Sequence, residues 1–372
     1  MKIFMMSITA ALLIMSIPGG AVSNEQPRDT ITVSAVGDIM MGSTHPDVKL
    51  PPKDGAGMFD GVEPFLSDSD VVFGNLEGPL FDGEATPKCQ NPSKTCYAFK
   101  TPTRYVRHLQ EAGFNVLGIA NNHANDFGPE GLSSTLSTLE QAGIQATGGS
   151  AVAVFSVGEK RVAVAGFSYS MSPYSNSILN IVEAKRIVRE LKQTHDLVIV
   201  SFHGGAEGKG ALRIPGGSEV FLGEDRGDVK AFARAVIDAG AAMVIGHGPH
   251  VVRALEVYKG KLIAYSLGNF LAYERFNLEG ASGRSFVLQA RLDADTGDFV
   301  GGKVISVRLV NEGIPEPDPE QQAVQLARRL TRQDIPNAGI TIAGDGTLAP
   351  HRPPRAKKNR DAPMPGSKAR SR

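Results

Sequence analysis

Short runs rich in valine, isoleucine and alanine alternate with segments of helical periodicity along most of this sequence. The apolar runs predict buried strands at residues 31–36, 71–73, 116–120, 197–202, 243–245 and 262–267. Helices are predicted between them at residues 103–112, 131–142, 181–193 and 228–239, and three of these segments are followed directly by glycine. This alternation predicts an α/β fold with a substantially parallel sheet at its core.

Two further pairs of apolar runs predict antiparallel strands. Residues 152–157 and 161–167 flank a short Gly-Glu-Lys turn, and residues 286–292 and 304–310 flank a polar loop. With 372 residues, of which 41% are hydrophobic, the chain is long enough for one large globular domain or two smaller ones. We therefore expect antiparallel pairing in addition to the parallel core.

Polar side chains follow each predicted core strand at its carboxyl end. The set is Asp38, Asn75, Glu77, Asn122, His123, His203, Glu207, His247, His250 and Asn269. In open α/β sheets, ligands bind in the crevice beyond the carboxyl ends of the strands, so we expect one cleft to collect these side chains. Taken singly, each residue also fits an ordinary role: Asp38 fits a turn or helix cap, and His203 fits a hydrogen-bonded core histidine.

The combination of carboxylate, amide and imidazole groups indicates a metal site. Manganese, zinc and iron accept such ligands, and no cysteine takes part in the set. Two divalent ions fit better than one, because a bridging carboxylate and about three further ligands per ion use the whole set. Other chemistries find less support: Ser266 does not lie in a Gly-x-Ser-x-Gly elbow, and the glycine-rich segments lack a Walker lysine.

Residues 1–23 have the layout of a secretory signal peptide. Lys2 precedes an apolar stretch at residues 3–17, and the small residues Ala21 and Ser23 follow at the expected cleavage site. Because the apolar stretch is short for a bilayer span, we expect a periplasmic or secreted protein that is cleaved after Ala21 or Ser23. An uncleaved membrane anchor is the alternative.

Cys89 and Cys96 are the only two cysteines, and a polar loop separates them. The six residues between them can close a small ring, and an exported protein meets oxidising conditions. We therefore predict a disulfide bridge between these two cysteines. Two free surface thiols are the alternative.

The C-terminal segment, residues 350–372, differs in composition from the rest of the chain. From Arg352 onward it holds eight lysines and arginines against one aspartate, although the formal net charge of the whole chain is zero. Its many prolines and few apolar residues predict disorder. A polyanion or an anionic membrane surface is the expected partner, and a merely solubilising tail is the alternative. Export and the lack of a basic folded domain argue against nucleic acid as a partner.

Six ordered motifs lie within residues 30–310, and they read SAVGDIMMG, VVFGNLEGPL, VLGIANNHANDFG, VSFHGGAE, VIGHGPHV and IAYSLGNF. Together they resemble the bacterial capsule-synthesis CapA family, a branch related to the calcineurin-like metallophosphoesterases. The resemblance implies a metallophosphoesterase-like sandwich of central β-sheets flanked by helices, over residues 30–349. Members of the family are associated with the production of poly-γ-glutamate and capsules.

The resemblance also implies roles for the residues at the strand ends. The implied ligands are Asp38 and His250 for a first metal ion, Asn122, His203 and His247 for a second, and Glu77 or Asn75 as the bridge. His123 is the implied catalytic histidine, which protonates the leaving group or stabilises the charge of the transition state. Met40 stands where the wider superfamily has a histidine, which implies a weaker first site or a single occupied metal.

These features lead to the expectation of an exported metal-dependent phosphoesterase that acts in capsule or envelope polymer synthesis or processing. The expected substrate is a polymer of the poly-γ-glutamate type, a precursor of that polymer, or another phosphoester. The alternative is a non-catalytic accessory protein that binds an anionic capsular polymer. Four cations near the motifs are predicted either to hold an anionic substrate or to form solvated surface: Lys209, Arg213, Arg226 and Arg253.

Overall fold

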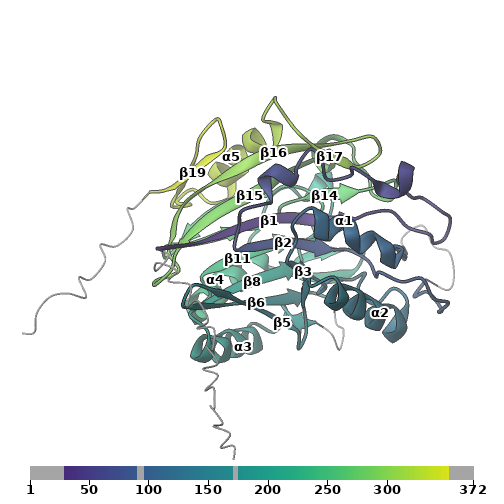
Figure 1. Ribbon diagram of the computed structural model, residues 1–372. Helices are drawn as coiled ribbons and strands as arrows, with labels where there is room; N and C mark the ends of the chain where they lie inside the picture. Colours follow the sequence, from purple (N-terminus) through teal and green to yellow (C-terminus); the bar gives the residue numbers. More distant parts are fainter. Residues whose placement is uncertain (1–28, 90–95, 171–174, 352–372) are drawn as a thin grey trace, which may run out of the picture.

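Two β-sheets form the centre of the protein in a computed structural model that describes residues 29–89, 96–170 and 175–351 (Figure 1). The predicted signal peptide, residues 1–23, lies outside the described residues, and so does the C-terminal segment beyond residue 351. Within the described part of the chain, no helix is long and apolar enough to cross a membrane.

The first sheet has ten strands, which come from the N-terminal and C-terminal parts of the described chain. Its strands are β1 (Thr30–Met40), β2 (Val71–Leu76), β3 (Val116–Gly118), β4 (Gln145–Thr147), β14 (Asn269–Ala272), β15 (Arg284–Asp293), β16 (Phe299–Val310), β17 (Ile314–Pro317), β18 (Ile340–Ile342) and β19 (Thr347–Pro350). The spatial order is β18-β19-β16-β15-β1-β2-β3-β4, with β14 beside β1 and β17 beside β16. Strands β1 to β4 run parallel to one another, whereas β15 and β16 are antiparallel.

The second sheet has seven strands. They are β5 (Val152–Val157), β6 (Lys160–Ser168), β7 (Asn176–Ser177), β8 (Leu197–His203), β11 (Met243–His247), β12 (Leu255–Tyr258) and β13 (Lys261–Ala264). The four central strands β6, β8, β11 and β13 are parallel, and β5 and β12 close the two edges in antiparallel pairing. A separate hairpin is formed by β9 (Glu219–Phe221) and β10 (Glu224–Gly227).

Helices cover the outer faces of this sandwich (Figure 1). They are α1 (Val106–Glu111), α2 (Gly128–Gln141), α3 (Ile181–Thr194), α4 (Val229–Ala239) and α5 (Gln322–Asp334). Short 3₁₀ helices lie at Pro52–Gly55, Glu63–Phe65, Thr103–Tyr105, Lys209–Ala211 and Gly280–Gly283. Helices α1 and α2 pack on the first sheet, α3 and α4 pack on the second, and α5 contacts β12, β15 and β16.

The main hydrophobic core lies between the two sheets. Strand β1 shows the alternation that places it there, because Ile31, Val33 and Ala35 all join this core and are fully buried. Val36 and Ile39 instead join a second core, under α1 and α2. Strand β1 is therefore buried on both faces, as expected for a central strand of a layered α/β fold.

The structure confirms the predicted α/β sandwich with parallel strands in both sheets and the two antiparallel pairs. The predicted strand at 262–267 is wrong in its second half: β13 ends at Ala264, and β14 begins at Asn269 in the other sheet. The chain thus crosses from one sheet to the other between these two strands. Hydrophobicity does not reveal such a crossing, because residues 262–267 are apolar or small throughout and fully buried.

Candidate metal centre

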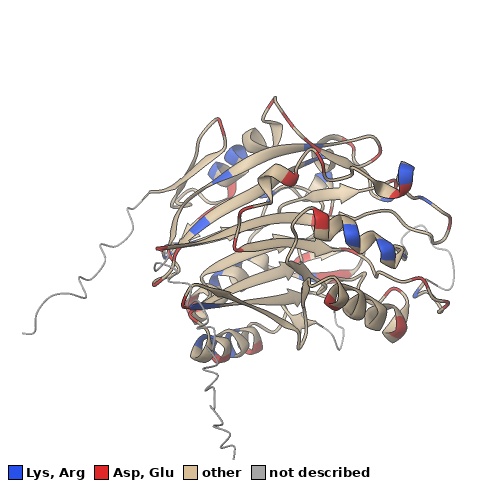
Figure 2. Ribbon diagram, viewed as in Figure 1, with Lys and Arg blue, Asp and Glu red and all other residues tan. Residues whose placement is uncertain are grey.

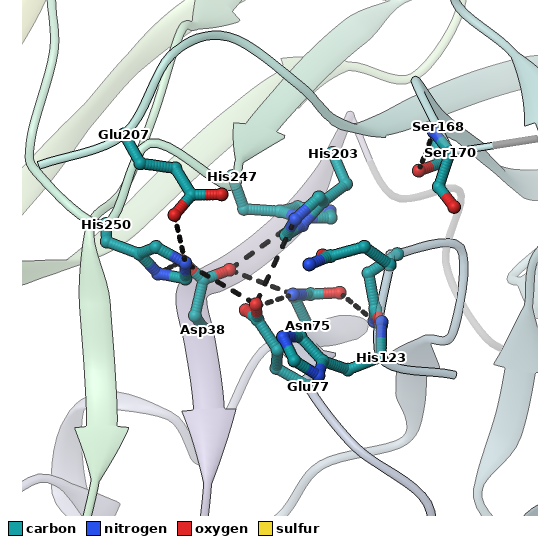
Figure 3. A network of polar contacts seen from close by, with 12 residues as sticks. Asp38, Asn75, Glu77, His123, Ser168, Ser170, His203, Glu207, His247 and His250 are labelled. Carbon is teal, nitrogen blue, oxygen red and sulfur yellow. Dashed lines mark hydrogen bonds and ion pairs between the residues drawn. The ribbon is translucent and has the colours of Figure 1, made fainter. Parts of the chain in front are cut away.

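The carboxyl ends of strands from both sheets meet at one place. Asp38 of β1 pairs in register with Asn75 of β2 and with Asn269 of β14, and His203 of β8 pairs with His247 of β11. Figure 3 shows the side chains of Asp38, Asn75, His203 and His247 pointing toward one another. The sandwich therefore brings together residues that are more than a hundred positions apart in the sequence.

A bulge in β1 turns Asp38 into this cleft. The register of β1 against β2 shifts between Ala35 and Asp38, at the position of Gly37. A Cβ atom on Gly37 would lie 1.8 Å from the carbonyl oxygen of Gly268, so only glycine allows this approach. The same carbonyl accepts a hydrogen bond of 3.0 Å from the backbone N–H of Asp38. The close crossing of two backbones thus fixes the position of the carboxylate.

Two groups of metal-capable side chains share Asp38. One group is Asp38, His203 and His247, and the other is Asp38, Glu77 and His250; within each group the ligand atoms lie within 4.8 Å of one another. In the second group, Nδ1 of His250 lies 3.0 Å from Oδ2 of Asp38, and its Nε2 lies 3.5 Å from Oε1 of Glu77. In the first group, Nδ1 of His247 lies 3.8 Å from Oδ1 of Asp38 and 3.0 Å from Nδ1 of His203. Oε1 of Glu77 also lies 4.0 Å from Nε2 of His203, which connects the two groups.

Several buried atoms of this cleft have no hydrogen-bond partner among the described residues. They are Oε1 of Glu77, Nε2 of His203 and Nε2 of His247, and Oδ1 of Asn122, the residue before His123, is a fourth buried atom without a partner. A buried polar atom left without a partner costs about 1–3 kcal/mol, so native proteins rarely leave several. All four are atoms with a lone pair that coordinates a cation, and the donor set of carboxylate, amide oxygen and imidazole therefore fits divalent transition metals.

The pKa values of these groups are shifted in opposite directions. Burial raises the pKa of Glu77 well above its usual value, and the charge of Asp38 adds to this rise. Burial lowers the pKa of His203 well below its usual value and that of His247 to about 4. Burial opposes protonation of His250 too, but Glu77 and Asp38 outweigh it and raise its pKa to about 10. Opposed shifts of this size in one cleft are typical of functional sites.

The backbone of His250 is unusual as well. Its φ angle is 57°, in the left-handed region that non-glycine residues seldom adopt. Oδ1 of Asn269 lies 2.9 Å from Nδ1 of His250, and the amide of Asn269 also donates to the carbonyl of His250 at 3.3 Å. Strained residues that are held in place in this way concentrate at functional sites.

Two asparagines connect the two groups to His123. Nδ2 of Asn75 donates to Oδ1 of Asp38 at 2.8 Å and to Oε2 of Glu77 at 3.3 Å. Its Oδ1 accepts from Nδ2 of Asn121 at 3.0 Å, and Oδ1 of Asn121 accepts from the backbone N–H of His123 at 3.0 Å. In this arrangement Asn75 orients two carboxylates.

His123 is buried beside a second carboxylate. Its Nδ1 lies 2.9 Å from Oδ2 of Asp126, which is fully buried, and the ring of Phe99 packs at a tilt against the imidazole with centroids 4.4 Å apart. Burial lowers the pKa of His123, although Asp126 opposes the shift. The His123–Asp126 pair therefore has an imidazole whose orientation is set by a carboxylate.

The model of one protein family matches the part of the chain that forms this cleft. Residues 32–274 match the model of the bacterial capsule synthesis protein PGA_cap. The chain belongs to the PGA_cap family. The matched region contains both groups that share Asp38 and the His123–Asp126 pair, so the cleft is part of the PGA_cap domain.

Curated relatives agree with membership of the PGA_cap family. The capsule biosynthesis protein CapA of Bacillus anthracis is 31% identical over 264 residues, which cover 66% of this chain and 60% of that protein. The PGA biosynthesis protein CapA of Bacillus subtilis is 29% identical, over 65% of this chain and 63% of that protein. The chain thus matches less than two thirds of the length of these two relatives.

Solved structures with a similar arrangement are more distant. A hypothetical protein from Thermus thermophilus has a TM-score of 0.45 and 16% identity, covering 77% of this chain and 100% of that one. A 5'-nucleotidase from Candida albicans has a TM-score of 0.42 and 10% identity, covering 83% and 59%. These low scores carry no functional weight for this PGA_cap chain.

The PGA_cap cleft contains one carboxylate that the sequence analysis did not assign. Asp126 lies three residues after His123, and this His-x-x-Asp spacing is the signal that would have found it. Lys88, which contacts Asp126, carries no such signal, because it lies far from His123 in the sequence.

The predicted disulfide between Cys89 and Cys96, next to Lys88, is confirmed.

Of the two alternatives predicted for Arg226 and Arg253, solvated surface is wrong, because both side chains are buried. Arg253 is fully buried, and its guanidinium pairs with Glu219 at 2.8 Å through two nitrogens. Arg226 is 3% exposed and pairs with Glu207 at 2.5 Å, with its guanidinium over the ring of Tyr169. Both arginines therefore stabilise the loops around the cleft. Lys209 and Arg213 are largely exposed, and Arg213 pairs with Asp334.

Proposed function

We propose that this chain is an exported, metal-dependent phosphoesterase that acts in capsule or envelope polymer synthesis or processing. The observation that supports this proposal most strongly is the set of buried, unpartnered ligand atoms around Asp38. A hydrogen-bonded structural cluster would have satisfied these atoms with protein donors and acceptors. Their chemistry favours divalent transition metal ions, two in number and drawn from manganese, zinc and iron.

Each ion has an assigned set of ligands in this proposal. His203, His247 and Asn122 would hold one ion, and Glu77 and His250 would hold the other. The residue common to both groups is Asp38, whereas the family resemblance implies Glu77 or Asn75 as the bridge. Divalent ions bound there supply the Lewis-acid charge that phosphoester hydrolysis uses. Asn75 keeps the two carboxylates in place through its amide group.

His123 is the proposed general acid. Asp126 engages its Nδ1, so Nε2 is the atom left to give a proton to the leaving oxygen of a phosphoester. The chain of Asn75 and Asn121 joins the backbone of His123 to the carboxylates of the metal ligands. The protein thereby fixes the distance between proton donor and metal centre before substrate arrives.

The substrate is proposed to be a phosphoester of a capsule or envelope polymer. Two PGA_cap relatives are named for capsule biosynthesis and PGA biosynthesis, so we place the phosphoester in a capsule or envelope polymer or its precursor. The disulfide supports a periplasmic or extracellular location, where such bridges persist. Cleavage of residues 1–23 would release the protein, and retention would anchor it to the membrane.

Stripping and reloading the metal tests this function. We expect chelated protein to lose turnover of a simple phosphomonoester, and to recover it with manganese, zinc or iron, because the ligand atoms return to a paired state. Turnover is measured as released phosphate before chelation, after chelation and after each metal is added. A wild-type protein that cleaves no phosphoester with any of the three metals would contradict the proposal.

A second candidate function is binding of an anionic polymer without catalysis. A groove of about 310 Å³ lies between α5 and the edge strand β18, and its lining includes Arg328, Arg332 and His351. None of its described lining residues is acidic. Figure 2 shows lysine and arginine gathered on α5 beside β19, after which the basic C-terminal segment begins. A linear polycarboxylate complements this charge.

Charge reversal in this groove tests the second candidate. We expect Arg328→Glu with Arg332→Glu to weaken binding of poly-γ-glutamate by about tenfold or more, equivalent to roughly 1.4 kcal/mol. Lys185→Glu with Arg189→Glu on α3 is the matched control, because it makes the same charge change at the same spacing. Equal binding by both double variants, measured by fluorescence anisotropy of labelled polymer, would rule the groove out.

A further inference from the structure

The disulfide lies next to the His123–Asp126 pair. It joins Cys89 to Cys96, whose Cα atoms are 5.9 Å apart. The residue just before the bridge is Lys88, and Phe99 follows shortly after it. Both flanking segments contact Asp126, so the bridge ties together two parts of the chain that hold one carboxylate.

The Lys88 flank holds Asp126 through its backbone and its side chain. The backbone N–H of Lys88 donates to the carbonyl of Asp126 at 2.8 Å. Its Nζ lies 2.6 Å from Oδ1 of Asp126 and donates to the carbonyl of Asn122 at 2.9 Å. Nζ also lies 3.4 Å from Nδ1 of His123. Lys88 thus contacts the carboxylate, the imidazole and the segment that joins them.

The Phe99 flank holds the other oxygen of the same carboxylate. The backbone N–H of Phe99 donates to Oδ2 of Asp126 at 2.6 Å, and this oxygen also meets Nδ1 of His123. The ring of Phe99 packs on the imidazole of His123 at an interplanar angle of 31°. Each flank therefore contacts a different oxygen of the Asp126 carboxylate.

Burial makes these contacts important for Asp126. Its side chain is fully buried, and a buried carboxylate is costly unless charges and hydrogen bonds compensate it. Lys88 supplies the positive charge, and it is 32% exposed at the mouth of the site. Without Lys88, the carboxylate would keep Phe99 and His123 as donors but would lose its cation. We expect Asp126 then to move toward water and away from His123.

We infer that Lys88, tethered by the Cys89–Cys96 bridge, is a positioning residue that fixes Asp126 against Nδ1 of His123. This inference rests on the proposed role of His123 as the general acid. Lys88 touches neither the metal ligands' side chains nor, in this account, the substrate. Its effect on the reaction passes through Asp126 and the orientation of the imidazole.

Two phosphomonoesters with different leaving groups distinguish positioning from plain destabilisation. 4-Nitrophenolate leaves without help from a proton, whereas an alkoxide leaves only when it is protonated. A variant with a misplaced His123 should therefore lose more turnover on an alkyl phosphate than on 4-nitrophenyl phosphate. A protein that is merely less well folded loses activity on both esters by the same factor.

We expect Lys88→Met to lower kcat on the alkyl ester by roughly 10- to 100-fold, the range found when a residue that orients a metal-ligating histidine is lost. The loss on the nitrophenyl ester should be smaller, with KM and metal content near the wild-type values. Cys89→Ser with Cys96→Ser should cause a loss of the same kind, and Lys88→Arg should retain most of the activity.

Lys259→Met is the matched control. It removes an exposed lysine in the turn between β12 and β13, whose Nζ also lies 2.6 Å from an aspartate, Asp238. This variant should keep both activities. Equal losses on the two esters for Lys88→Met, or unchanged activity on both, would overturn the inference.

The inference also has a readout that does not depend on turnover. The imidazole nitrogen resonances of His123 in ¹⁵N-labelled protein should shift in Lys88→Met and in the double serine variant, but not in Lys259→Met. If the wild-type protein cleaves neither ester, the proposed function fails, and these resonances still decide the positioning role. Resonances unchanged in both test variants would refute it.

Discussion

Replacing His203 or His247 with alanine is expected to remove bound metal and phosphoester turnover together. Nε2 of each imidazole is buried and has no hydrogen-bond partner, but the same holds for His195. What points to a metal is that His203 and His247 lie beside Asp38, whereas His195 does not. Both histidines belong to the same group as Asp38, and loss of either leaves that ion with fewer ligands. We expect turnover to fall by more than about 100-fold, which exceeds the effect typical of residues that only support a ligand.

Metal content by elemental analysis and turnover by phosphate release measure this effect on the same preparations. His195→Ala is the matched control, because this histidine caps α3 away from the cleft and makes no contact with the two groups. It should leave metal and turnover unchanged. Full metal content in both His203→Ala and His247→Ala would show that these imidazoles are structural.

His123→Ala should separate chemistry from metal binding. A single general acid contributes about 10²- to 10⁴-fold to a rate, so we expect turnover to fall by that factor. Metal content should stay near the wild-type value, since His123 belongs to neither group that shares Asp38. The loss should be greatest with a poor leaving group, which needs the proton most.

His108→Ala provides the control for His123→Ala. His108 is also a buried histidine, but it lies on α1 against Asp54, outside the cleft. Its loss tests the general cost of emptying a buried imidazole site. If His123→Ala and His108→Ala reduce turnover equally, or if His123→Ala also releases metal, His123 is not the general acid.

The convergence of the cleft residues could be predicted from the sequence because it follows from sheet geometry. Asp38, Asn75, His203 and His247 each stand at the carboxyl end of an apolar run, and parallel strands bring such ends to one edge. The positions of the strand ends can be found from local patterns in the sequence. How the two sheets face each other cannot be found in this way, and the cleft contains residues from both sheets.

The rest of the cleft depends on contacts between distant backbones. Gly37 and Gly268 are ordinary glycines in the sequence, yet their close crossing places Asp38. Lys88 meets Asp126 only because a loop returns beside α2, and the fully buried Arg253 looks like a surface cation until Glu219 is found beside it. Tertiary packing decides which residues pair across such distances, and the local periodicity of the sequence does not indicate these pairs.

The central claim is that the groups around Asp38 bind catalytic metal, and elemental analysis of the wild-type protein tests it most directly. Protein stripped with a chelator is reloaded with manganese, zinc or iron, freed of excess ion, and assayed for metal per chain. We expect about two ions per chain, as in dinuclear phosphoesterase sites, and a return of turnover with the metal. Protein that retains none of the three metals after reloading would contradict it.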